Sequence, residues 1–146
     1  MQLDHHPVLA AHPGIRFDAA DRNLYPHGLV ARTCVKRWMF WACQQFSPAI
    51  SVLVWEQVGK QMIEGGAPDP LALACGTAEL AQAAAVLDHH LSTREWLVGG
   101  QATLADYAVA APLMTMEQAG LPLEGYPCLL AWFARVKELP ASRLPD

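Results

Sequence analysis

Charge is scarce in this sequence. Asp, Glu, Lys and Arg make up 16% of the 146 residues, whereas they make up about 25% of an average soluble domain. The formal net charge is −4 and no long basic run is present, so we expect no nucleic-acid partner, because backbone phosphates require clustered Lys and Arg. The chain is 53% hydrophobic, which is enough to build the core of one domain of ordinary size.

Long hydrophobic runs and leader patterns are missing as well. No apolar stretch in the sequence approaches the roughly 20 residues that cross a bilayer, so we expect no membrane partner. Residues 1–6 contain neither the basic segment nor the apolar segment of a secretory leader. These two absences predict a cytoplasmic location.

Cysteine is sparse, and none of the four cysteines lies in a Cys-x-x-Cys pair. Free thiols are therefore expected instead of a disulfide framework. Three of the four lie in apolar, helix-like segments, so we expect buried side chains. Neither Cys34 nor Cys43 stands at a predicted helix N-terminus, where a thiolate would be stabilised, and we expect no nucleophile there. The four are Cys34, Cys43, Cys75 and Cys128.

Metal-ligand spacing is absent. His89 and His90 are adjacent on a predicted helix and point about 100° apart, so they do not chelate one ion. His5, His6 and His12 form a local group near the N-terminus. No histidine pair has the i, i+4 spacing of the zinc-protease motif, and there is no glycine-rich phosphate loop. We expect no metal site.

Alternating strand patterns of useful length are also absent, and the periodicity that is present is helical. Residues 1–27 are interrupted by Pro and Gly, which predicts an irregular N-terminal segment. Residues 28–146 are predicted to form an all-α domain of four to six helices. The predicted helices cover about 28–65 and about 70–91, then a segment from Thr103 and a segment from near Pro127.

Several prolines and one glycine are expected to bend or end these helices. Pro48 is expected to kink or split the first helix, and Pro112 to bend the third. Gly120 is predicted to end the third helix, and Pro140 the last.

The clearest local signal is a capping box. Gly99 and Gly100 reverse the chain, and Thr103 stands three residues before Asp106, ahead of an Ala-rich apolar run. The Thr103 hydroxyl can accept the backbone N–H of residue 106, and the Asp106 carboxylate can accept the N–H of Thr103. We therefore interpret Asp106 as a structural cap and not as a catalytic acid.

The residues around this cap closely resemble the C-terminal helical domain of the glutathione S-transferases. The segment 96–107, Trp-Leu-Val-Gly-Gly-x-x-Thr-x-Ala-Asp-Tyr, is the most specific piece, and Tyr126-Pro127 followed by Trp132 adds to it. Leu24-Tyr25-Pro26 resembles the linker into that domain. The resemblance implies an all-α, glutathione S-transferase C-terminal-like helical bundle.

In that family, glutathione is held by an N-terminal thioredoxin-like domain. Only 23 residues precede Leu24, too few for one βαβ unit, so we expect no catalytic residue and no cofactor-binding residue in this chain. The resemblance also implies a pocket for an apolar co-substrate, with Trp38, Trp41, Gln45 and Met114 as candidate lining residues. The alternative interpretation of these four residues is core packing.

Two classes of function remain open. The first is a stand-alone helical module that binds a protein or a hydrophobic small molecule. The run from Trp38 to Trp41 supports it, because no rotation of a helix hides four consecutive large apolar side chains. Its partner would be a second copy, through the first two helices, or a thioredoxin-like chain. The second class is part of a glutathione transferase, supplying the electrophile pocket and a dimer interface, with glutathione as the cofactor. Glu56 is expected to be a solvated or interface charge.

Overall fold

The computed structural model describes residues 24–139, and every regular element in that range is helical. The all-α prediction is confirmed. The helices are α1 (Leu29–Trp41), the π-helical η2 (Ala42–Phe46), α2 (Ser47–Gln57), the 3-10 helix η3 (Gly59–Met62), α3 (Pro70–Leu91), α4 (Leu104–Ala110), the 3-10 helix η4 (Ala111–Thr115), α5 (Met116–Ala119) and α6 (Pro127–Lys137).

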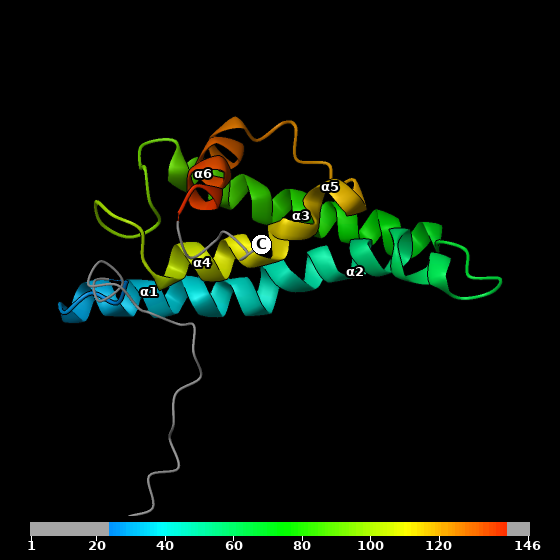
Figure 1. Cartoon of the computed structure of the whole chain (residues 1–146), viewed down its shortest axis with the longest axis horizontal. Helices are drawn as coiled ribbons and strands as arrows, with labels where there is room; N and C mark the ends of the chain where they lie inside the picture. Colours follow the sequence, from blue (N-terminus) through cyan, green and yellow to red (C-terminus); the bar gives the residue numbers. More distant parts are fainter. Residues whose placement is uncertain (1–23, 140–146) are drawn as a thin grey trace, which may run out of the picture.

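The helices form an elongated bundle (Figure 1). α1, η2 and α2 run end to end as one rod, and α3 returns along α2 in the opposite direction. α4 packs against α1, and α6 packs against α3. The predicted irregular segment 1–27 and the predicted stop at Pro140 fall mostly outside the described residues; residues 24–28 are irregular, and α1 begins at Leu29.

Where Pro48 was predicted to kink or split the first helix, the helix changes type: α1 ends at Trp41, and the π-helical η2 separates it from α2, which begins at Ser47. Proline has no N–H and its ring crowds the carbonyl four residues earlier. The π-helical turn η2 comes just before it, with the Ser47 N–H donating to the Ala42 carbonyl five residues back. Pro48 then occupies the first turn of α2, where a missing N–H costs little. The wider turn therefore accommodates the proline without breaking the rod.

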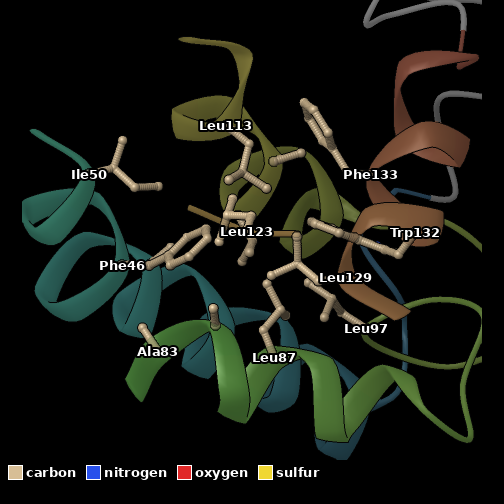
Figure 2. Packing of buried hydrophobic residues seen from close by; sticks show 14 of the residues in the cluster. Phe46, Ile50, Ala83, Leu87, Leu97, Leu113, Leu123, Leu129, Trp132 and Phe133 are labelled. Atoms are coloured by element: carbon tan, nitrogen blue, oxygen red, sulfur yellow. The ribbon is translucent and has the colours of Figure 1, made fainter. Parts of the chain in front are cut away.

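The core lies where α1, α2, α3, α4 and α6 meet. Figure 2 shows Phe46, Leu87, Leu113 and Leu129 converging there, and all four are fully buried. α3 can approach α2 closely at Gly76, where a Cβ would lie 3.2 Å from side-chain atoms of both Val52 and Leu53. A small residue at that crossing thus sets how close α3 and α2 lie.

Thr103 and Asp106 form the predicted capping box at the start of α4. The Asp106 carboxylate is fully buried and accepts the Thr103 N–H at 2.9 Å. It also accepts the Leu97 N–H at 3.1 Å and the Trp132 indole N–H at 2.8 Å. One carboxylate thus joins the loop before α4, the first turn of α4 and the middle of α6.

The predicted third helix is shorter than expected. The α-helical pattern stops at Ala110, and Pro112 lies in the 3-10 turn η4, so the bend expected at Pro112 is a change of helix type. α5 then ends at Gly120, whose φ of 59° is the left-handed conformation of a glycine C-cap, as predicted.

The prediction that the cysteine side chains are buried is wrong. All four cysteines are free, as expected, but Cys43 and Cys75 are exposed, and Cys34 and Cys128 are only half-buried. Apolar neighbours in sequence did not imply burial, because consecutive helical residues face different directions.

Glu56 is buried instead of solvated. It accepts the Asp69 N–H at 2.7 Å, and Lys60 lies 2.7 Å from the same carboxylate oxygen. The hydrogen bond from Asp69 and the ammonium of Lys60 hold the pKa of Glu56 below its usual value. The carboxylate therefore joins the end of α2 to the start of α3.

α3 corrects the expectation that no segment is long enough to span a membrane. By length and composition alone this helix would pass as a membrane span, which is weak evidence. Its Leu80, Ala84 and Leu87 side chains are fully buried, and the helix packs against α2 and α6. In this fold α3 serves as a core helix.

Candidate interaction and ligand-binding surface

Two adjoining hollows lie along the line where the α1–η2–α2 rod meets α3, which we call the α1–α3 seam. The first hollow has a volume of about 560 Å³, and side chains from the end of α1, from η2, from α2 and from α3 form its walls. Its lining residues are Trp41, Gln44, Gln45, Pro48, Glu79, Gln82, Ala83 and Val86.

The second hollow, which we call the Arg37–Arg94 hollow, has a volume of about 570 Å³. It lies at the end of the seam formed by α1 and the C-terminal end of α3, and it shares Trp41 and Val86 with the first hollow. Its lining residues are Arg37, Trp38, Trp41, Val86, His89, His90, Ser92, Thr93 and Arg94.

The Trp41 ring contacts two other aromatic rings. It meets Trp38 edge to face, with ring centroids 5.2 Å apart and an interplanar angle of 82°. It also stacks on Phe46, with centroids 5.3 Å apart and an angle of 18°. Trp38 and Phe46 are buried, while Trp41 is half-buried, so a rigid aromatic surface remains available at the centre of the seam.

His90 connects α3 to both neighbouring segments. Its ring lies 4.6 Å from the Trp38 ring, and its Nε2 lies 2.8 Å from the Leu97 carbonyl. Arg94 places an N–H donor 3.0 Å from Nδ1. Arginine has no acceptor atom, so Nδ1 of His90 accepts the hydrogen bond from Arg94. The proton of the neutral ring is then on Nε2, which donates to the Leu97 carbonyl. Burial lowers the pKa of His90, and the positive charges of Arg94 and Arg37 act in the same direction.

Formal charge is distributed unevenly along the seam. Arg37 and Arg94 line one end and no acidic residue lines that hollow, whereas Glu79 lines the other end. The uncharged Trp41 and Val86 lie between these ends. The seam is therefore positive at one end, apolar in the middle and negative at the other.

The four candidate pocket residues do not share one pocket. Trp41 and Gln45 line the first hollow, and Trp38 and Trp41 line the second. Met114 is 47% exposed on η4 and lines neither. The spacing of Trp38, Trp41 and Gln45 places them on one side of the rod, which faces α3, whereas η4 packs on the rod elsewhere.

A third hollow, of about 510 Å³, lies between α2 and η4. It is mostly apolar, and Trp55 is its largest side chain, 51% exposed. A Cβ on Gly59 would clash with the Trp55 ring, so glycine there leaves room for the indole. The lining residues are Ser47, Ile50, Ser51, Val54, Trp55, Val58, Gly59, Ala111, Pro112 and Thr115.

The sequence did not predict several of the residues that line the seam. Val86, His90 and Arg94 come from α3 and the turn after it, far from Trp38 in the sequence. The i, i+4 spacing of His90 and Arg94 was a signal for their mutual contact. Their approach to Trp38 depends on how α3 packs on α1. Among residues 24–139, no group of three or more His, Cys, Asp or Glu side chains is arranged to hold a metal ion.

Comparison with known proteins gives a consistent result. The family model described as "Glutathione S-transferase, C-terminal domain" matches residues 49–140, more than half of the chain. FtsZ-localized protein A of Caulobacter vibrioides is 30% identical over 114 residues, which cover 77% of this chain and 50% of that protein. Glutathione S-transferase theta-1 of Mus musculus is 33% identical over 115 residues, which cover 77% of this chain and 48% of that protein.

Solved structures agree. A glutathione S-transferase structure from Rhodospirillum rubrum superposes with a TM-score of 0.74 at 31% identity, covering 82% of this chain and 55% of that one. The chain spans about half the length of the curated relatives it matches. The residues matched by the family model include α3 and the capping box. The chain therefore belongs to the glutathione S-transferase family, and its described helices form the C-terminal domain of that family.

Proposed function

We propose that this chain is a helical interaction module that self-associates through the α1–α3 seam. The observation that carries the proposal is Trp41, a large aromatic ring that two neighbours hold rigidly at the surface between two hollows. Rigid, half-exposed aromatic side chains of this kind are typical anchors of protein interfaces. The exposed Val86 beside it, 52% accessible, extends the apolar centre.

The charge pattern of the seam favours a second copy as the partner. In a two-fold interface the same patch faces itself with its ends reversed. A two-fold axis near Trp41 and Val86 would place the Arg37 and Arg94 end of one copy opposite the Glu79 end of the other. The seam is thus electrostatically complementary to itself, which favours this partner over a thioredoxin-like chain.

The relatives support an interaction role in a general way. One of them, FtsZ-localized protein A, is named for its localisation with another protein and not for a transferase reaction. We expect the helical domain on its own to hold no glutathione, since the groups that hold it in this family belong to the thioredoxin-like domain. A hydrophobic small molecule stays a further candidate ligand of the seam. The cytoplasm is the proposed location.

Sedimentation velocity at micromolar concentration tests the proposal. We expect the wild-type chain to sediment as a dimer, and Val86→Glu to sediment as a monomer because it buries an unpaired charge at the two-fold centre. Val30→Glu is the matched control, since Val30 is 79% exposed near the start of α1 and lies outside the seam. A monomeric wild type, or equal dissociation of both variants, would contradict the proposal.

A second function has its own observation. The apolar hollow between α2 and η4 has the composition of a binding site for a hydrophobic molecule. Under this alternative, the chain contributes the electrophile pocket of a glutathione transferase, the activity named for several relatives. Trp55→Ala would then weaken binding of an apolar dye at this hollow while leaving the sedimentation of the chain unchanged.

A further inference from the structure

The Arg37–Arg94 hollow, which forms the positive end of the α1–α3 seam, also has the chemical character of an anion site in the single chain. Its lining contains two arginines and no carboxylate, in a chain whose formal net charge is −4. Arg37 has no hydrogen-bond, ion-pair or ring partner within residues 24–139. Two arginines that line one hollow without a lining carboxylate produce a local positive potential that attracts anions.

Arg94 is positioned by its neighbour. Its guanidinium donates to His90 Nδ1 at 3.0 Å, and His90 is held in turn by the Leu97 carbonyl at 2.8 Å and the Trp38 ring at 4.6 Å. One contact to His90 uses one of the five N–H donors of an arginine. The other donors remain for a ligand, and the guanidinium is already oriented before the ligand arrives.

The remaining wall of the hollow is aromatic and apolar. Trp38 and Trp41 stand almost perpendicular to each other, at 82°, and Val86 borders them. A flat ring can lie against the indole of Trp41, which is itself held in place by Phe46. The volume of about 570 Å³ lies in the range of sites for small molecules.

We propose that the Arg37–Arg94 hollow binds a small aromatic carboxylate. The carboxylate takes donors from Arg37 and Arg94, and the flat ring lies on the Trp38–Trp41 surface. Guanidinium groups suit this role because their planar donors match the two oxygens of a carboxylate. This site is distinct from the apolar hollow between α2 and η4, which has no charged lining residue.

Isothermal titration calorimetry with naphthoate tests the site, and naphthamide serves as the uncharged ligand of the same shape. We expect saturable binding of naphthoate with one site per chain, and binding of naphthamide weaker by at least about tenfold, the factor for a lost charge-assisted hydrogen bond. Equal affinity for the two ligands would overturn the proposal, since the arginines would then contribute nothing.

Variants of the two arginines test whether naphthoate binds in this hollow. Arg37→Gln and Arg94→Gln should each weaken naphthoate binding by at least about tenfold and leave naphthamide binding unchanged. Arg32→Gln is the matched control, because it removes the same charge from the same helix and Arg32 lies over the Tyr25 ring, outside the hollow. Arg37 is exposed and without partners in the described part of the chain, so its variant retains the fold.

Two results would overturn the assignment. One is an Arg32→Gln effect as large as that of Arg37→Gln, which would show a general charge effect. The other is naphthoate binding that survives both hollow variants, which would place the ligand elsewhere. Arg37 and Arg94 also belong to the seam proposed for self-association, so the titrations are run at a concentration at which sedimentation shows the chain to be monomeric. Naphthoate binding there tests this site whether or not the dimer forms.

Discussion

At the scale of single residues, Asp106 stands out because one buried carboxylate serves three N–H donors besides the Thr103 hydroxyl. These N–H donors are the backbone groups of Leu97 and Thr103 and the indole of Trp132. Removing the carboxylate leaves all three buried without an acceptor. An unsatisfied buried donor costs about 1–3 kcal/mol, so Asp106 matters more to the fold than an ordinary helix cap.

Asp106→Ala should therefore lower the free energy of unfolding by at least about 3 kcal/mol. Thr103→Ala, which removes only the cap hydroxyl, should cost about 1 kcal/mol. Urea denaturation followed by circular dichroism gives both values. Equal losses for the two variants would show that the bonds to Leu97 and Trp132 contribute nothing beyond the cap.

At the scale of elements, the contact between α3 and α1 at His90 and Trp38 favours the neutral form of the histidine. His90 lies against Trp38 of α1, and burial lowers its pKa below the usual value for histidine. Its neighbours Arg94 and Arg37 lower that pKa further, while the Leu97 carbonyl and the Asp106 carboxylate oppose the shift. The folded chain thus takes up a proton at His90 at lower pH than the unfolded chain does.

This difference gives a signed pH dependence. Below about pH 6.5, the usual pKa of histidine, the unfolded chain binds the proton first, so stability falls as pH falls until the lower folded pKa is passed. His90→Gln does not titrate and can still donate to Leu97. Its urea midpoint should therefore decline less than that of the wild type between about pH 8 and about pH 5. Equal declines of the urea midpoint in the two proteins would contradict the prediction that folding lowers the pKa of His90.

The elements also show what a sequence can predict. The bounds of α3, from Pro70 to Leu91, and the cap at Thr103 were predictable because Pro, Asp and Thr act on the backbone within one turn. The accommodation of Pro48 by η2 was not, since a π turn depends on how α2 packs. Glu56 was misjudged because its partner, the Asp69 N–H, belongs to another helix.

The candidate site was predicted only in part, for the same reason. Trp38, Trp41 and Gln45 were named as candidates from the family resemblance. Val86 and Arg94 reach Trp41 only through the return of α3 along the rod. No periodicity within one segment reports a contact between two segments, and Met114 was grouped with the tryptophans without such a contact.

At the scale of the whole molecule, the described part of the chain is a bundle of helices without a thioredoxin-like sheet (Figure 1). Glutathione carries two carboxylates and an amine, and the few contacts a helical domain offers do not offset the cost of ordering a small flexible ligand. We expect calorimetric titration of the chain with reduced glutathione to show no saturable binding at sub-millimolar concentration. Saturable binding, or conjugation of an aromatic electrophile above the uncatalysed rate, would favour the transferase alternative.

The π turn before Pro48 has a consequence for insertions and deletions in the rod. A π turn holds one residue more than an α-helical turn, so the turn Ala42–Phe46 takes up one extra residue between α1 and α2. Deleting Gln44 would close the wide turn and press the proline ring onto the carbonyl four residues earlier. We therefore expect deletion of Gln44 combined with Pro48→Ala to destabilise the chain less than deletion of Gln44 alone.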